Sequence, residues 1–450
     1  MIIQRYGDLE VGITREVATR WSPFINPTSL YTAIIMGVGH GDFHPVAAQY
    51  GGGSLQQRMA VLLRDVSAGR DLLRPPAGWQ RLGGLPTANP DRPASIWRPV
   101  PPPGYVALGD IASLEQPGSW VACVKQVHNG RAYVRQGEAG GLLWESAGVR
   151  LWSVVPPPYP DGDLDERLFL PVGAFTVVST AGRPNPTPTT WILDLPAAVE
   201  RGPGPGIPVL TSHSRPPAQT RVTDRTVTVP YFMVDDPNRS VDWRIDNSPF
   251  YRIRRHRNFD LVLFRDNRAG TVAQTEAEEI TTGVTHEAGT SFSVTTGITV
   301  GTSVGVEASA KPFGVGASTT VTASVSASLE VGYETRRNVA VLSEQKKTRG
   351  LVIPPHSTGC LWMERHELVP VRADGSVLSA QAALGFRTDY YVTGEFPGGT
   401  GVIPFTSDAS GTRTALPATH LPPFSTFPRT AAGASLPDTP TDPGEPAGGQ

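Results

Sequence analysis

The stretch from Phe292 to Tyr333 constrains the fold more than any other part of this sequence. From Phe292 to Ala310 the even-numbered positions carry apolar residues or threonine, while serine, threonine, glycine and glutamate fill the odd positions. After the Lys311–Gly314 segment the alternation resumes with the apolar set at odd positions, beginning at Val315. A period of two predicts β-strands that each have one apolar and one polar face.

The change of parity predicts an antiparallel hairpin that turns at Pro312 and Phe313. In this register Ala310 lies opposite Val315, and both apolar sets share one face. Each arm is about twice the roughly 9–11 residues that a transmembrane strand needs. A membrane does not tolerate the open edges of an isolated hairpin, so such a hairpin would close into a barrel with copies of itself. The pattern alone leaves two hypotheses open: a pore-forming hairpin, or a long hairpin within an ordinary sheet.

The register sorts the hairpin into three groups of residues. The face predicted to contact lipid consists of Val300, Val304, Val306, Ala308, Ala310, Val315, Ala317, Val321, Ala323 and Val325. The face predicted to line the lumen consists of Ser303, Gly305, Glu307, Ser309, Ser318, Thr320 and Thr322. The tip, Lys311, Pro312, Phe313 and Gly314, would cross the membrane first, with Phe313 as its apolar anchor. Charged residues beyond Leu329 place the crossing part at about residues 300–325.

Composition favours an all-β chain without an obvious catalytic site. The 450 residues include 48 glycines and 44 prolines, which favour turns and short strands. The net charge of −2 gives no reason to expect a nucleic-acid partner. Cys123 and Cys360 form neither a disulfide framework nor a metal motif. Phosphate-loop and His-Glu-x-x-His motifs are missing from the sequence, and we expect no enzyme, no metal and no cofactor.

A short repeat marks the first half of the chain. Residues 75–83 and 101–109 both fit the pattern Pro-Pro-x-Gly-aromatic-x-x-Leu-Gly, which predicts similar β units around a shared core. Around the second copy, residues 95–111 resemble the signature of the Vps62-related domain. The matching residues are Trp97, Arg98, Pro99, Gly104, Tyr105, Gly109 and Asp110. The resemblance implies a prism-like, all-β interaction or sorting module over about residues 60–200, without catalytic residues.

The second half contains strand-like segments with a basic cluster. Arg252, Arg254, Arg255, His256 and Arg257 follow one another within six residues. Such a cluster could contact anionic lipid headgroups. The alternative, which we favour, is a solvated strand face in which some arginines pair with acidic neighbours.

Residues 225–400 resemble the aerolysin-like β-pore-forming toxins, including the insecticidal ETX/MTX2-type proteins. The resemblance rests on Pro-Phe-Tyr-Arg-Ile at 249–253, the amphipathic hairpin, the charged segment after it, and Ile-Pro-Pro-His at 353–356. It implies an elongated antiparallel β domain in a soluble protein that binds a target-cell surface, oligomerises and inserts a hairpin. The implied partners are a target membrane, a receptor of unknown chemistry (glycan, lipid or protein) and further copies of the chain.

Four segments are therefore expected. They are a Vps62-like β domain at 1–200 that would recognise a surface, a Pro/Gly-rich linker at 201–219, a pore-forming domain at 220–405 with the hairpin at 292–333, and a disordered tail at 406–450. An apolar stripe predicts one short helix near residues 55–67.

The expected site of action is a target membrane, reached from the soluble state. The N-terminus shows no Sec-type signal, and no apolar run is long enough for a transmembrane helix, so we expect release by another route. The alternative function is a non-lytic binding or trafficking module in which the hairpin is a fixed structural ribbon.

Overall fold

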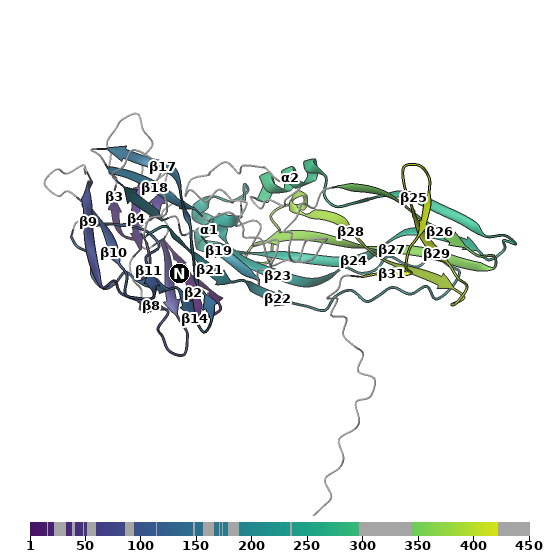
Figure 1. Cartoon of the computed structure of the whole chain (residues 1–450), viewed down its shortest axis with the longest axis horizontal. Coiled ribbons are helices and arrows are strands. Elements are labelled where there is room, and N and C mark those ends of the chain that lie inside the picture. The colour runs from purple at the N-terminus through teal and green to yellow at the C-terminus, as the bar shows by residue number, and fades with distance from the viewer. Residues whose placement is uncertain are drawn as a thin grey trace, which may run out of the picture.

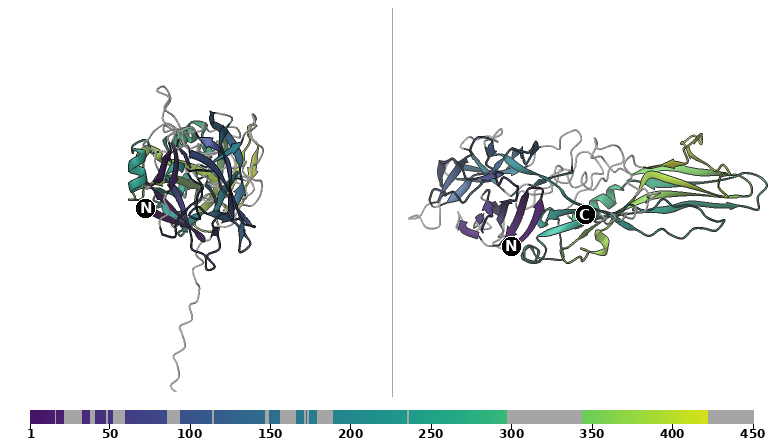
Figure 2. Two further views of the ribbon diagram at one scale, coloured as in Figure 1. Left: turned by 90° about the vertical axis from the view of Figure 1, so that its left-hand side faces the viewer. Right: turned by 90° about the horizontal axis from the view of Figure 1, so that it is seen from below.

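The computed structural model shows an elongated, all-β protein (Figures 1 and 2). It describes residues 1–15, 17–21, 33–37, 41–47, 49–51, 60–85, 94–113, 115–146, 149–155, 166–170, 172, 174–178, 189–234, 236–296 and 344–421. The N-terminal strands gather at one end, and the long strands β24, β27 and β28 run toward the other (Figure 1). The all-β class expected from the sequence is therefore confirmed.

The N-terminal region repeats one arrangement of six strands three times. In the first unit the strands are β2 (Leu9–Thr14), β3 (Val17–Trp21), β4 (Ala33–Gly37), β5 (His44–Pro45), β6 (Gln49–Gly51) and β7 (Ala60–Asp65), with β1 (Ile2–Tyr6) added beside β2. In the second they are β8 (Leu73–Arg74), β9 (Gly78–Leu85), β10 (Ala94–Val100), β11 (Tyr105–Val106), β12 (Ile111–Ser113) and β13 (Cys123–Lys125). In the third they are β16 (Val134–Gln136), β17 (Glu138–Ser146), β18 (Val149–Val155), β19 (Arg167–Leu170), β20 (Phe175–Val178) and β21 (Trp191–Pro196).

Each unit builds one sheet from its first, fourth and last strands and another from the three remaining strands. The first kind of sheet is β2-β7-β5, β8-β13-β11 and β16-β21-β19; the second is β3-β4-β6, β9-β10-β12 and β17-β18-β20. The hairpin of β14 (Val127–His128) and β15 (Arg131–Ala132) separates the second and third units. The strands of the first kind of sheet contribute to one shared core.

The three units meet where the chain leaves β5, β11 and β19. A methyl group added at Gly109 would lie 2.8 Å from the Cβ of Ala174 and 3.3 Å from the Cβ of Ala47. A separation below 3.0 Å is not tolerated between such carbons, so position 109 needs glycine because the backbones approach closely. This contact gives a structural reason for the glycine of the predicted motif.

The prediction of similar β units around a shared core is confirmed, but the sequence repeat does not mark those units. Its first copy, at 75–83, leads into β9, the second strand of its unit. Its second copy, at 101–109, leads into β11, the fourth strand of the same unit. The copies therefore share a turn chemistry, Pro-Pro-x-Gly before an aromatic strand residue, and not a position in the fold.

The short helix predicted near 55–67 is wrong for the residues that the structure describes. Residues 60–65 form the strand β7, which pairs with β2 and β5. Ala60, Val61, Leu62 and Leu63 are all buried, so the strand is covered on both faces. Such a strand reads as a continuous apolar run, which a short stretch of sequence does not distinguish from a helix.

The second half is built on a six-stranded antiparallel sheet with the order β22-β23-β24-β27-β28-β31. Its strands are β22 (Ala198–Arg201), β23 (Val222–Pro230), β24 (Phe250–Asn267), β27 (Ser357–Val371), β28 (Leu384–Phe396) and β31 (Thr419–His420). The short helices η1 (Tyr231–Met233), α1 (Val241–Asn247) and η2 (Ala380–Ala382) connect or flank these strands. Ser240 caps α1 by accepting a hydrogen bond from the Trp243 amide.

A second sheet of four strands covers the far end of the first. It has the order β25-β26-β29-β30 and consists of β25 (Gln274–Thr282), β26 (Gln345–Ile353), β29 (Ile403–Ser407) and β30 (Arg413–Ala415). Ile280, Leu351 and Ile353 of this sheet pack on Leu361 and Met363 of β27. The far end is therefore a two-layer sandwich with its own core.

The two halves share one core, and the domain boundaries need correction. Tyr6 donates a hydrogen bond of 3.1 Å to the carbonyl of Thr228, and both halves contribute to a single apolar cluster. The strand β22, at 198–201, pairs with β23 and so belongs to the long sheet. The predicted disordered tail starts too early, since residues up to His420 form β30 and β31. No helix in the described part of the chain is both long and apolar enough to cross a bilayer.

Candidate functional site

The predicted hairpin lies in the connection between two paired strands, β25 and β26. Gln274 pairs with Ile353 at one end of this ladder and Thr282 with Gln345 at the other, so residues 283–344 form one excursion from its open end. Within the ladder, even-numbered residues of β25 lie opposite odd-numbered residues of β26. The sequence register pairs the same parities. The ladder is thus the base on which such a hairpin would stand.

Most of the predicted hairpin residues lie outside the described residues. These are the lipid-facing set from Val300 to Val325, the tip at 311–314 and the lumen-facing set from Ser303 to Thr322. Their predicted roles stay predictions. The five hairpin residues that the structure does describe, 292–296, form the end of helix α2 (His286–Thr296). The prediction that a strand begins at Phe292 is therefore wrong for this state of the protein.

Helix α2 forms against the preferences of its own residues. Most residues after Gly289 are serine, threonine, valine or phenylalanine, which favour strands or caps over helix interiors. Thr285 caps the helix by accepting a hydrogen bond of 3.0 Å from the amide of Ala288. Phe292 is 2% exposed and belongs to the apolar cluster that contains Leu384 and Phe386 of β28. Packing of this ring, and not helix propensity, holds α2 in place.

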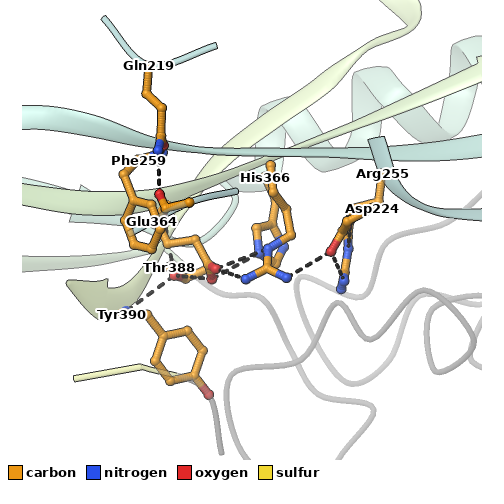
Figure 3. A network of polar contacts seen from close by, with 10 residues as sticks. Gln219, Asp224, Arg255, Phe259, Glu364, His366, Thr388 and Tyr390 are labelled. Atoms are coloured by element: carbon orange, nitrogen blue, oxygen red, sulfur yellow. Dashed lines mark hydrogen bonds and ion pairs between the residues drawn. The ribbon is translucent and has the colours of Figure 1, made fainter. Parts of the chain in front are cut away.

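A buried row of polar side chains crosses the six-stranded sheet (Figure 3). We call it the polar belt; it consists of Asp224 on β23, Arg255 and Arg257 on β24, Glu364 and His366 on β27, and Thr388 on β28. Phe386 on β28 borders the belt, because its ring centroid lies 5.4 Å from that of His366, and β28 also contacts α2.

The belt is a continuous chain of charge-assisted hydrogen bonds. Arg255 donates to both carboxylate oxygens of Asp224, at 2.9 and 2.6 Å. Arg257 donates to Asp224 at 2.8 Å through Nη1 and to Glu364 at 3.0 Å through Nε. Glu364 lies 3.1 Å from Nε2 of His366 and accepts from the Thr388 hydroxyl at 3.2 Å. Two carboxylates therefore balance two guanidinium groups, and the row is neutral when His366 is neutral.

The belt shifts the pKa values of its members. Burial alone would raise the pKa of Glu364, but His366 and Arg257 outweigh it and lower the pKa to about 2. Burial lowers the pKa of His366, and Arg255 and Arg257 add to this effect, while Glu364 opposes it. The Nδ1 atom of His366 has no hydrogen-bond partner within the described chain. The histidine is therefore held in its neutral form.

The basic cluster of the sequence divides between the two faces of β24. Arg255 and Arg257 are 4% and 9% exposed, so the prediction of a solvated face is wrong for them, whereas the predicted pairing with acidic residues is confirmed. Sequence reasoning missed the belt because its acids lie on other strands. The sequence does contain a signal for the belt. Ionisable residues occupy alternate positions, 255 and 257 on one strand and 364 and 366 on another, and the next residues on the same strand face, Phe259 and Leu368, are apolar.

Stability is expected to fall as the pH drops below about 6.5, the ordinary pKa of histidine. The folded-state pKa of His366 is lowered, so the unfolded chain binds more protons, and stability is lost as the pH falls toward the folded-state value. One proton gives a slope of at most about 1.4 kcal/mol per pH unit. Urea unfolding between pH 7.5 and 5 measures it, and His366→Gln should flatten the slope.

His256 serves as the control for this pH dependence. Burial lowers its pKa as well, and it lies next to Thr223 on the opposite face of β24. The variant His256→Gln should remove only its own share of the slope. An unchanged slope in His366→Gln would show that the belt histidine does not titrate in this range.

The Vps62-like motif residues have structural roles in the second unit. Arg98 forms a bidentate pair with Asp110, at 2.9 and 2.8 Å, and also donates to the Val177 carbonyl at 2.7 Å. This contact ties the second unit to the third. Gly104 has a φ of 82°, which favours glycine. The relation to Vps62 itself stays a prediction.

The remaining motif residues lie within the same unit. Tyr105 is buried and donates a hydrogen bond to the Asp71 carbonyl. Trp97 pairs with Ile111, and Pro99 pairs with Trp79.

The described residues contain no obvious catalytic chemistry. Within them, no group of three or more histidine, cysteine, aspartate or glutamate side chains is placed to hold a metal ion. Cys123 and Cys360 are both buried and free, and burial raises the pKa of each thiol to about 12. Neither thiol is therefore a nucleophile at neutral pH.

Part of the second half is similar in sequence to a family of insecticidal toxins. A family model described as Insecticidal Crystal Toxin, P42, matches residues 224–369, which run from β23 to β27 and include the hairpin and most of the polar belt. No curated protein matches the sequence.

Two solved structures resemble the chain. GNIP1Aa from Chromobacterium piscinae shares 19% identity over 39% of this chain and 34% of its own, with a TM-score of 0.29. The chain thus spans about a third of that protein. Cry35Ab1 shares 10% identity over 88% of this chain and 91% of its own, with a TM-score of 0.37.

Proposed function

We propose that this protein is an insecticidal, aerolysin-like toxin that forms pores. It would bind a target-cell surface through its N-terminal half, assemble into a ring, and insert the 283–344 connection as a β-hairpin from each copy. The match of residues 224–369 to an insecticidal toxin family supports the class.

One observation carries the step from toxin to pore. In β25 the buried residues Ile280 and Thr282 have even numbers, and in β26 the buried residues Leu351 and Ile353 have odd numbers. The sequence beyond the ladder keeps the same parities for its apolar residues on both arms. If the ladder lengthens without a bulge, its apolar face continues unbroken along the whole hairpin. A hairpin built only as a loop would have no reason to keep that agreement.

Helix α2 supports a change of structure on insertion. Its last five residues, 292–296, belong to the alternating pattern and yet are helical in this state, so local preference and observed structure disagree. Such conflicts are expected where a segment has a second functional conformation. The segment would leave the core cluster that contains Phe292 and join the growing ladder, while the residues of β25 and β26 form the stem.

Leakage of dye from vesicles of insect midgut brush-border membrane tests this function. Wild-type protein should release the dye and yield ring-shaped oligomers. Val304→Lys and Val321→Lys should each reduce leakage by at least about tenfold, because a lysine facing lipid near the bilayer midplane costs roughly 2–4 kcal/mol per copy.

The neighbouring residue Ser303 provides the matched control. Ser303→Lys introduces the same side chain on the predicted lumen face, where water surrounds it, so leakage should persist. Equal loss in Ser303→Lys and Val304→Lys would mean that the faces are assigned wrongly. A wild-type protein that stays monomeric and releases no dye would favour the alternative, a non-lytic binding or trafficking module with a fixed hairpin.

A further inference from the structure

Strand β25 presents a long open edge. It is the outer strand of the four-stranded sheet, and among the described residues only β26 pairs with it. Its nine residues contain neither proline nor glycine, and Thr275, Ala277, Glu278 and Glu279 are exposed. An uninterrupted edge of this kind is a template for pairing with another strand.

The open edge is acidic. Glu276, Glu278 and Glu279 lie within four residues of one another on β25. The side chain of Glu279 is 62% exposed and lies 3.5 Å from Lys346, and Glu276 lies 3.9 Å from Arg265, whereas Glu278 forms no ion pair within the described part of the chain. The strand therefore carries more negative charge than its own neighbours balance.

The next strand is basic, and one end of it is uncovered. Lys346, Lys347 and Arg349 lie on β26. Lys347 and Arg349 pair with Asp389 of β28, and the side chain of Lys346 is 60% exposed. On the side away from β25, strand β29 pairs only with residues Thr348 to Val352. Among the described residues, Gln345, Lys346 and Lys347 thus have a strand partner on one side only.

We infer that the acidic edge of β25 docks beside the basic, uncovered end of β26 in a second copy of this chain. Each copy has an acidic edge strand and, on the same sheet, a basic strand end that is paired on one side only among the described residues, so the contact is head-to-tail and repeats until a ring closes. Opposite charges on facing strands set which edges meet and in which order. This inference rests on the proposed pore function and assigns the contact between subunits. An acidic edge that only prevents aggregation is the competing explanation.

Charge reversal at Glu279 and Lys346 tests the contact. Each of the changes Glu279→Lys and Lys346→Glu puts two like charges together at positions 279 and 346. This happens twice, between β25 and β26 within one copy and at the proposed contact between two copies. Each variant alone should form about tenfold fewer membrane-bound oligomers than wild type. An equal mixture of the two variants should recover oligomers, because opposite charges then meet between copies although not within either copy. A chain that carries both changes should also recover.

Salt and a distant charge pair provide the controls. Raising NaCl from 0.05 to 1 M should weaken wild-type assembly and narrow its difference from the single variants, because exposed charges are screened. Asp42→Lys makes the same change of charge in an exposed ion pair with Arg70, at 3.4 Å, in the first N-terminal unit, and should leave assembly unchanged.

The outcomes separate this inference from the proposed function. Normal oligomers and leakage in both single variants would overturn the docking contact and leave the pore intact. Failure of the mixture to recover, with both variants folded by circular dichroism, would also overturn it, since the loss would then arise within one copy. A wild-type protein without oligomers or leakage would instead refute the pore itself.

Discussion

Glu364→Ala is expected to lower the free energy of unfolding by about 3–5 kcal/mol, because it removes one partner from a buried, hydrogen-bonded ion pair. Glu364 is 1% exposed and accepts hydrogen bonds from Arg257 and Thr388, with His366 at 3.1 Å. Without the carboxylate, Arg257 keeps only Asp224, which Arg255 already engages, and the belt gains a net positive charge. Urea unfolding at pH 7.5 measures the loss.

Glu367 gives a matched control on the same strand. It lies on the opposite face of β27, where it pairs with Arg221; the side chains of Glu367 and Arg221 are 17% and 51% exposed, against 1% for that of Glu364. Glu367→Ala should reduce stability by less than about 1 kcal/mol, because exposed ion pairs contribute little. Equal losses in the two variants would contradict the view that burial makes the belt critical. A Glu364→Gln variant, which keeps the size and one acceptor oxygen, should fall between them.

The belt also explains why the long strands do not have a uniformly apolar face. Along β27 the same-face residues run from Leu368, in the core shared by the two halves, through His366 and Glu364 to Trp362, in a second apolar cluster. The charged row therefore separates two cores within one sheet. Only a fixed pairing of strands β23, β24, β27 and β28 satisfies every charge, which makes the belt a determinant of register.

Sequence reasoning reached the elements that have their own periodicity. The strand β24, which carries the basic cluster, is expected from the sequence as a strand-like segment. Sequence reasoning did not reach features that depend on partners distant in the chain. The buried strand at 60–65 lacks alternation because both faces are covered, and the belt joins Asp224 to Glu364 across three strands. The arrangement in three units could not be predicted from the sequence repeat either, because both copies of the repeat lie in the second unit and share only a turn.

Helix α2 shows a second reason why a local sequence pattern can fail to predict the observed structure. The alternation at 292–296 is present in the sequence, but the structure contains a helix there. Tertiary packing of Phe292 overrides the local preference. The pattern thus predicts a conformation that this state does not show, and the proposed pore state would be the one in which it appears.

Phe292→Ala is expected to release α2 and accelerate pore formation. The ring is 2% exposed, and removing a buried phenylalanine side chain costs about 3–5 kcal/mol. Among the α2 side chains that the structure describes, Phe292 is the buried apolar one, so the loss should appear as local release, with the released population rising by roughly a hundredfold or more. Trypsin should then cleave the 283–344 connection faster, and dye leakage from brush-border vesicles should begin after a shorter lag.

Thr290→Ala is the control for this latch, because Thr290 lies on the same helix and is exposed. It should change neither the rate of cleavage nor the lag. If Phe292→Ala instead lowers the urea midpoint of the whole protein without faster cleavage of the connection, α2 is part of the cooperative core and does not act as a latch. If cleavage accelerates but leakage does not, release of α2 is not the step that limits insertion. The same pair of measurements therefore distinguishes a stabilising helix from one whose displacement controls when the hairpin enters the membrane.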